Sequence, residues 1–219
     1  MFSNTIFLAI AATLPLAFSS PIPAPAVAQT SALNDTDSIQ SGPAWYSGPY
    51  YNFPSIDTWL GFDDMFNRNK NSMSANGDTG DDIGRIYNAI KDAATIGVDE
   101  RVILGIIMQE SHGDVGVRTT YSPEGIPTAG IMQCSGCNGY PGQHGLSQDQ
   151  ITSMVRGGTE HFKANLRDWG DQQATSSIYP ALREYNSGSV CDQNDLSNGC
   201  GATASYVSDI SQRLQGWVD

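Results

Sequence analysis

The sequence predicts a mainly α-helical domain over residues 55–219, built around a buried central helix and interrupted by a loop-rich insert. Three observations predict this class. Apolar residues recur at helical spacing in several segments after residue 55, and residues 100–111 are apolar on almost all sides. Residues 113–146 are rich in glycine, proline and threonine and have no sustained period. Because a helix that is apolar all round is normally buried, residues 100–111 are expected at the centre.

Residues 1–20 have the features of an export signal. They contain no charged side chain, and an apolar run of signal-peptide length extends from Ile6 to Phe18. The basic residues that usually precede such a run are absent. A membrane anchor is the alternative, but Pro15 and a run shorter than about 20 residues argue against it. We therefore expect a secreted, extracellular protein that has no membrane association after signal cleavage.

Residues 21–54 are rich in proline, serine and glycine and read as a linker or pro-segment. Their aromatic part, SGPAWYSGPYYNFP, either packs on the domain or stacks on carbohydrate. Packing is the favoured interpretation, because isolated turns without a scaffold rarely form a binding module. The domain itself is expected to start at Ser55.

The helices before the insert are predicted from caps and spacing. Ser55 is expected to cap a helix that carries Trp59, Phe62 and Phe66 on one face. Residues 79–96 follow the helical period and end at a glycine suited to a C-terminal stop. Asp99 is placed to cap the apolar helix 100–111.

Loops and at most one short hairpin are expected between residues 113 and 146. Ser147 and Gln150 then form the pattern of a capping box. The helix that follows bears apolar residues from Ile151 to Trp169, and later helices run through residues 178–185 and 206–217. No internal repeat is visible.

The chain has four cysteines: Cys134, Cys137, Cys191 and Cys200. Four cysteines allow three pairings, and zinc binding is an alternative. An exported protein favours disulfides. The local pairs Cys134–Cys137 and Cys191–Cys200 are the first expectation, and cross-pairing stays open. No metal and no cofactor are expected, since the histidines form no recognised ligand spacing.

The net charge of −12 excludes a nucleic acid or an anionic membrane as the main partner, because both reward a basic surface. The acidic residues are spread over the domain rather than gathered in a tail. We expect a monomer.

Glu110 is the most informative residue, because it ends the most apolar helix in the chain. Burial and a helix C-terminus both disfavour a charged carboxylate and raise its pKa, so that it can donate a proton near neutral pH. On this feature alone, a side chain that emerges into solvent is the simpler interpretation. The motifs elsewhere in the sequence favour the other interpretation, a Glu110 side chain that stays buried.

Short motifs follow Glu110-Ser111 in a fixed order: Tyr121-Ser122-Pro123, Gly130-Ile131-Met132-Gln133, Glu184-Tyr185-Asn186-Ser187-Gly188 and Tyr206-Val207. Each motif is weak by itself. Together, over residues 80–217, the chain resembles the lytic transglycosylase (SLT domain) and goose-type lysozyme families of the lysozyme-like superfamily.

The resemblance implies a lysozyme-like α+β fold in which Glu110 is the catalytic acid. It implies a sugar-binding role for Ser122, Gly130, Met132, Gln133, Tyr185 and Asn186. For Met132 and Tyr185, core packing remains an alternative, and Ser122 and Gln133 have an alternative as turn residues. The region 118–128 looks longer than the family pattern, and the CSGC sequence after Gln133 is unusual.

The implied activity is cleavage of β-1,4 bonds between N-acetylated sugars, with peptidoglycan as the first substrate and a chitin-type polymer as the second. Hydrolysis and anhydro-forming transglycosylation both stay open. Two-carboxylate glycosidases need a second acidic group, for which Asp114 and Glu124 are candidates. Lytic transglycosylases need only one glutamate. The alternative is a non-catalytic carbohydrate-binding or effector protein that retains the groove.

Overall fold

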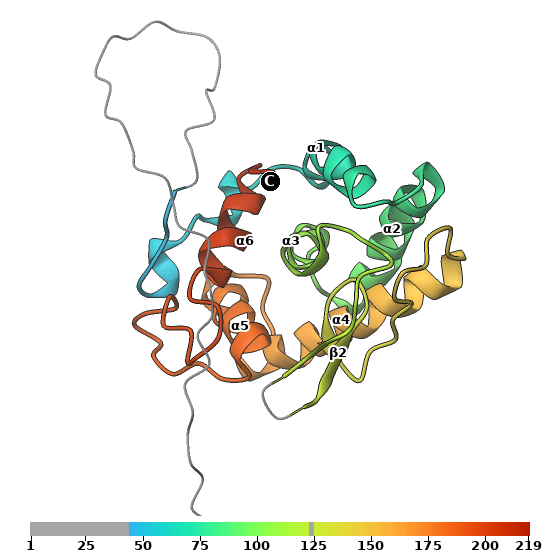
Figure 1. Ribbon diagram of the computed structural model, residues 1–219. Helices are drawn as coiled ribbons and strands as arrows, with labels where there is room; N and C mark the ends of the chain where they lie inside the picture. The colour runs from blue at the N-terminus through green and yellow to red at the C-terminus, as the bar shows by residue number, and fades with distance from the viewer. Residues whose placement is uncertain (1–43, 123–124) are drawn as a thin grey trace, which may run out of the picture. The chain divides into compact units, whose positions relative to one another are not determined.

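The computed structural model describes residues 44–122 and 125–219. The predicted export signal, most of the predicted linker and Glu124 lie outside the described residues. The described chain is mainly helical, with a small antiparallel sheet (Figure 1). Its α-helices are α1 (Phe62–Ala75), α2 (Gly80–Ala93), α3 (Glu100–Ser111), α4 (Gln148–Asp168), α5 (Thr175–Ser187) and α6 (Tyr206–Leu214).

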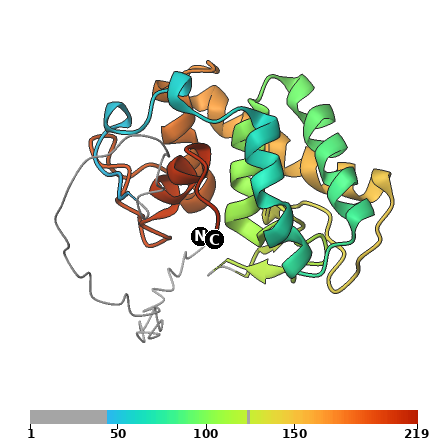
Figure 2. The same cartoon turned by 90° about the horizontal axis from the view of Figure 1, so that it is seen from above.

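Helix α3 is the buried central helix that the sequence predicts. Figure 1 shows it almost end-on, with the other α-helices around it. Seen from above, α1 and α2 lie on one side of α3, and α5 and α6 on the other (Figure 2). Every residue from Val102 to Met108 is buried. Burial of this whole surface removes a large apolar area from water and anchors the domain.

Gly105 sets the spacing between α3 and α6. A Cβ at this position would lie 3.1 Å from Cγ2 of Ile210 on α6. The missing side chain therefore lets the two helices approach closely. This approach matters for the site, because α6 begins beside the C-terminal end of α3.

The predicted caps of α3 and α4 are confirmed, and α2 has a cap that the sequence analysis did not predict. Thr79 and Asp82 form a capping box at the start of α2, and Ser147 and Gln150 form one at the start of α4. Asp99 accepts a hydrogen bond from the backbone of Arg101 at the start of α3. A short 3-10 helix, η3 (Ala94–Ile96), follows α2 and ends at the left-handed Gly97.

The first helix was misplaced by the sequence. Ser55 precedes only a 3-10 turn, η2 (Ile56–Thr58), and α1 starts at Phe62. Trp59 explains the break: its backbone is extended, and its buried indole N–H donates to the carbonyl of Pro54. The tertiary contact of this side chain overrides the helical spacing.

Residues 44–54 pack on the domain, as the favoured interpretation expected. The 3-10 helix η1 (Tyr50–Asn52) contacts α5, and Phe53 is buried with its ring 4.9 Å from that of Tyr179. The backbone N–H of Tyr46 donates to Oγ of Ser208 on α6 at 3.0 Å. The packed chain therefore starts before Ser55.

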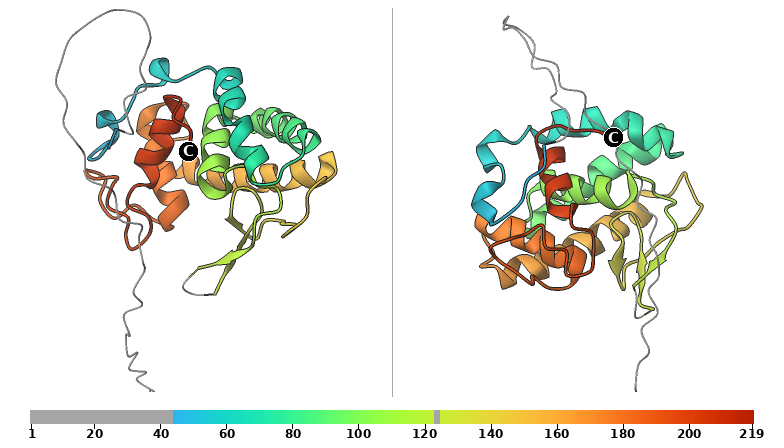
Figure 3. Two further views of the ribbon diagram at one scale, coloured as in Figure 1. Left: turned by 45° about the horizontal axis from the view of Figure 1, so that its top comes forward. Right: turned by 60° about the vertical axis from the view of Figure 1, so that its left-hand side comes forward.

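The insert contains more strand than expected. Strands β1 (Thr120–Tyr121), β2 (Pro127–Ala129) and β3 (Cys134–Ser135) form an antiparallel sheet in the order β1-β2-β3. Thr120 pairs with Thr128, and Ala129 pairs with Cys134. The left view of Figure 3 shows β1 and β2 extending away from the helices.

The cysteines form the two local disulfides expected first, Cys134–Cys137 and Cys191–Cys200. The first joins β3 to the following turn, and the second closes the loop between α5 and α6. Within the described residues, no helix has both the length and the apolar character that crossing a membrane requires.

Candidate active site

Glu110 lies in the last turn of α3, where three segments far apart in sequence converge. Oγ of Ser111, which is buried, lies 2.8 Å from the carbonyl oxygen of Ile131 and donates to it. This bond places the segment 130–133 beside the end of α3. Helix α6 packs along α3 and brings its first residue, Tyr206, to the same point.

Tyr206 is the direct partner of Glu110. Its hydroxyl donates to Oε1 of Glu110 at 2.6 Å, and the tyrosine is only 2% exposed. A buried tyrosine hydroxyl normally finds a polar partner, and here the partner is the carboxyl group. This hydrogen bond involves Oε1 of Glu110 and not Oε2.

Burial raises the pKa of Glu110 from 4.5 to about 7, and the hydrogen bond from Tyr206 lowers it by a smaller amount. Desolvation acts because the charged carboxylate loses water that the apolar helix does not replace. Among the described residues, no second carboxylate contributes to this shift. The group is therefore protonated in a large share of molecules near neutral pH.

Tyr185 on α5 is partly buried and lies near Glu110 and Tyr206. Burial and then the charge of Glu110 raise its pKa well above the ordinary value, which places the phenol within the electrostatic reach of the acid. Its hydroxyl donates to the backbone carbonyl of Met132 at 2.7 Å. The motif that contains Tyr185 and the motif that contains Met132 are thus in direct contact.

The side chain of Met132 is fully buried. A Cβ on Gly158 of α4 would lie 2.4 Å from Cβ of Met132, so the methionine packs directly against the α4 backbone. This favours the core-packing interpretation of its side chain. Its contribution near Glu110 comes from the backbone carbonyl that Tyr185 binds.

Asn186 is oriented by a buried arginine. Nη2 of Arg183 donates to Oδ1 of Asn186, and Arg183 is fully buried. Arginine only donates hydrogen bonds, so the amide oxygen must face it and the NH₂ group must face the other way. Arg183 also donates to the backbone carbonyl of Thr203, just before α6.

The side chains of Gln133 and Ser122 form hydrogen bonds within the small sheet and its turns. Nε2 of Gln133 donates to the carbonyls of Arg118 and Gly130, and its Oε1 accepts from Oγ1 of Thr120 at 2.8 Å. Oγ of Ser122 accepts from the N–H of Ile126 across the β1–β2 turn. These contacts favour the turn interpretation of both residues.

Gly130 has a left-handed backbone with φ of 76°. A Cβ there would lie 2.3 Å from the carbonyl oxygen of Asn138. The position therefore needs glycine for backbone geometry.

Asp114 points into a second cluster, with Asp78 and His144. Its Oδ1 accepts from the N–H of Gly116 at 2.7 Å and lies 3.9 Å from Nε2 of His144. This engagement makes it a poor candidate for the second carboxylate.

Sequence reasoning missed Tyr206 and Arg183 as site residues. Tyr206 belongs to a quoted motif, and its position on an apolar helix face carried a usable signal, because a buried hydroxyl needs a partner. Arg183 carried no comparable signal, because Glu184 follows it and two adjacent charged residues read as a solvated helix face.

Comparison with known proteins finds no protein-family model that matches the chain and no curated protein with significant similarity.

Proposed function

We propose that this protein is a secreted glycosidase or lytic transglycosylase of the lysozyme-like type, with Glu110 as its general acid. The single observation that carries the proposal is the half-buried carboxyl of Glu110, whose pKa is raised to about 7 by desolvation and whose only described hydrogen-bond partner is Tyr206. An acid with a pKa near the working pH is well matched to protonate a glycosidic oxygen.

The proposed substrate class rests on Asn186, which follows Tyr185 in the chain, and on the order of the motifs. The NH₂ group of Asn186 is turned away from Arg183 and can donate to the carbonyl of an acetamido group. The order of motifs that resembles lytic transglycosylases adds peptidoglycan as the first substrate and a chitin-type polymer as the second. The two disulfides support an extracellular location.

The mechanism needs one carboxyl group. Glu110 gives its proton to the leaving oxygen, the acetamido oxygen of the substrate stabilises the positive sugar centre, and the ionised Glu110 then accepts a proton from the attacking nucleophile. Water as nucleophile gives hydrolysis. The 6-hydroxyl of the same muramic acid gives an anhydro product. The engagement of Asp114 with His144 and Gly116 supports this single-carboxyl route.

The net charge of −12 shapes the choice of substrate. Intact bacterial walls are anionic and would repel an acidic enzyme. We therefore propose soluble wall fragments or a neutral chitin-type polymer as better substrates than whole cells.

The test is digestion of peptidoglycan and of chitin oligosaccharides, followed by mass spectrometry. Glu110→Gln should lower the rate on the active substrate by at least about a thousandfold, because the proton donor is lost. Glu160→Gln is the matched control, since Glu160 is exposed on α4 and, among the described residues, forms an ion pair only with Arg156 at the surface. An anhydro product is lighter than the hydrolysis product by one water.

Unchanged cleavage by Glu110→Gln would refute the site. Binding of these glycans by the wild-type protein with no cleavage of either would favour the non-catalytic carbohydrate-binding alternative.

A further inference from the structure

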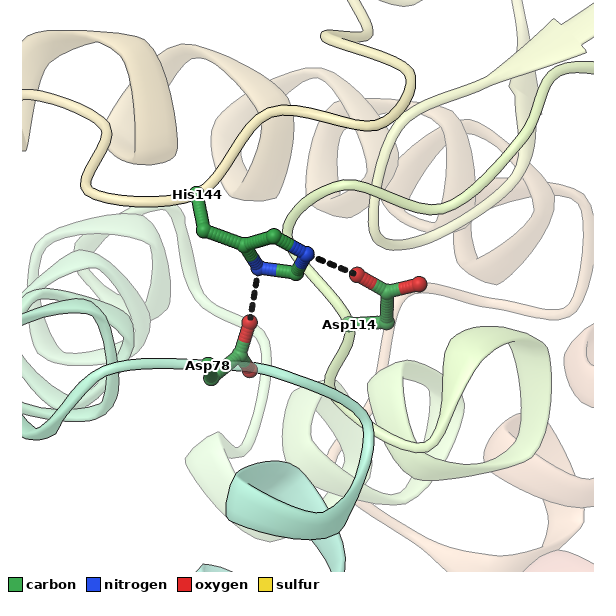
Figure 4. Close-up of side chains that lie close together, drawn as sticks. All are labelled: Asp78, Asp114 and His144. Atoms are coloured by element: carbon green, nitrogen blue, oxygen red, sulfur yellow. Dashed lines mark ion pairs between the residues drawn. The ribbon is translucent and has the colours of Figure 1, made fainter.

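A second group of ionisable side chains lies apart from Glu110 and Tyr206, where three loops meet. Asp78 comes from the turn between α1 and α2, Asp114 follows α3, and His144 precedes α4. Figure 4 shows the imidazole of His144 between the two carboxyl groups. One ligand atom from each residue lies within 4.8 Å of the other two.

The distances in this cluster are longer than those of good hydrogen bonds. Nδ1 of His144 is 3.4 Å from Oδ1 of Asp78, and Nε2 is 3.9 Å from Oδ1 of Asp114. Charge-assisted N–H···O bonds are usually about 2.7–2.9 Å long. Two atoms that each lie about 2.0–2.2 Å from one tetrahedral metal ion are about 3.4 Å apart. Nδ1 of His144 and Oδ1 of Asp78 have this separation, so Nδ1 is the nitrogen that would bind the ion. Asp114 faces the other nitrogen and would have to move closer to complete the site.

A buried oxygen of Asp78 is a second indication, independent of the distances, that the cluster binds a ligand. The side chain of Asp78 is completely buried. Oδ1 accepts from the N–H of Val115 at 3.1 Å, whereas Oδ2 has no hydrogen-bond partner among the described residues. A buried carboxylate oxygen without a donor is costly. A bound cation is one way in which proteins satisfy such a group.

The cluster is also short of positive charge. Among the described residues, neither Asp78 nor Asp114 forms an ion pair with a lysine or an arginine. Even a protonated His144 brings one positive charge to two carboxylates. A divalent cation would balance both.

The backbone is shaped around the imidazole. A Cβ on Gly77 would lie 3.1 Å from the ring of His144, and a Cβ on Gly116 would lie 3.2 Å from its Nε2. The N–H of Gly116 meanwhile holds one oxygen of Asp114. The side chain of His144 remains 32% exposed, so an ion can reach the site from solvent.

We propose that Asp78, Asp114 and His144 form a binding site for one divalent transition-metal ion, with zinc as the best match. One imidazole nitrogen and two carboxylates are ligands that zinc accepts, with water in the remaining position. The ion ties together three loops, one of which leaves the C-terminal end of α3 four residues after Glu110. This proposal differs from the expectation of no metal drawn from sequence spacing, because its ligands come from separate loops.

The test uses the purified chain without a histidine tag, stripped with a chelator and titrated with zinc chloride by calorimetry. One zinc ion per chain should bind. Zinc at a hundredfold excess over its dissociation constant should raise the Tm by about 5 °C, and the chelator should reverse this rise. Calcium chloride, titrated in parallel, should bind at least about tenfold more weakly, because an imidazole ligand disfavours it.

Variants separate this site from adventitious binding. His144→Gln and Asp114→Asn should each weaken zinc binding by at least about tenfold. Both side chains reach the surface, so the fold should tolerate the changes. The matched control is His112→Gln, because His112 forms another histidine–aspartate pair, 3.2 Å from Asp219, outside the cluster.

Zinc binding that survives in His144→Gln, or that His112→Gln weakens equally, would overturn the proposal. So would the absence of any zinc-dependent rise in Tm, or calcium binding as tight as zinc. These readouts do not involve glycan cleavage, so they stand or fall independently of the proposed activity.

Discussion

Glu110 and Asp82 are two carboxyl groups in one domain with opposite surroundings. Asp82 is fully buried, and its oxygens accept from the backbone N–H groups of Thr79, Gly145 and Leu146 and from the Thr79 hydroxyl, at 2.7–3.1 Å. Glu110 accepts from Tyr206. The pKa of Asp82 is lowered despite burial, which these donors outweigh, whereas burial raises the pKa of Glu110 to about 7.

The comparison shows that burial alone does not decide the charge of a carboxyl group. Donors that point at the oxygens replace lost water and keep Asp82 ionised. Glu110 has too few donors for this, and it holds its proton. Asp82 therefore ties α2 to the loop before α4, while Glu110 is suited to donate a proton.

Among the tests of this comparison, the largest expected effect is on the pH dependence of cleavage by the wild-type protein. Because Glu110 must be protonated to act as an acid, kcat/KM should fall about tenfold per pH unit above pH 7, or about a hundredfold by pH 9. Initial rates between pH 4 and 9, on the glycan that the protein cleaves, measure this fall, which is the alkaline limb of the pH profile. A flat profile up to pH 9 would contradict the role of Glu110 as acid.

Asp82→Asn should destabilise the fold by about 3 kcal/mol at pH 7, since an amide cannot accept from all four donors. The pKa of Asp82 is lower folded than unfolded, so its contribution is present above pH 3.8 and disappears as the pH falls through the folded value. The difference in unfolding free energy between Asp82→Asn and the wild-type protein, measured by urea unfolding, should be smaller at pH 3 than at pH 7.

The control for that experiment is Asp81→Asn. Asp81 lies in the first turn of the same helix, with an 82% exposed side chain paired with Arg85. Its replacement should change stability by less than about 0.5 kcal/mol. An equal loss in both variants would mean that helix charge, and not the buried donors, stabilises this region.

Glu110→Gln should make the protein more stable at alkaline pH. The pKa of Glu110 is higher folded than unfolded, so ionisation costs stability as the pH rises through about 7. Glutamine avoids this cost. The variant should gain about 3 kcal/mol at pH 8.5 and almost nothing at pH 4, as measured by urea unfolding. A gain of the same size at both values would exclude ionisation as the cause.

Tyr206→Phe should have the smallest effect. Loss of one hydrogen bond to the acid should lower kcat by about tenfold. The bond lowers the pKa of Glu110, so its removal should move the alkaline limb of the pH profile upward. Tyr87→Phe removes a comparable bond to Asp63 at the surface and should leave the limb in place. A downward movement in Tyr206→Phe would contradict the assigned geometry.

Local features of the fold could be predicted because short-range interactions decide them. Thr79 and Asp82, or Ser147 and Gln150, satisfy helix N–H groups within one turn, and this pattern is visible in sequence. The local disulfides bridge residues close in sequence. The start of α1 was not predictable, because Trp59 is held by Pro54 and Tyr179, and the latter is 120 residues away.

In the candidate site, too, the local features could be predicted from the sequence and the long-range contacts could not. The apolar character of residues 102–108 predicted a buried helix, and Glu110 at its end predicted a desolvated carboxyl group. Tyr206, the partner of Glu110, is 96 residues away, so no local pattern could pair them. Gln133 and Asp114 were assigned to the groove by resemblance and by proximity, but their hydrogen bonds and charge contacts belong to the sheet and to the His144 cluster.

The sequence by itself determined the helical class, the caps, the local disulfides and the position of Glu110, because spacing and burial preference act along the chain. Only the tertiary structure decided which carboxyl groups stay charged. That outcome depends on donors from distant segments: the backbone of residues 145–146 surrounds Asp82, whereas Glu110 meets the hydroxyl of Tyr206. Electrostatic free energy depends on separation in space, and folding alone sets that separation.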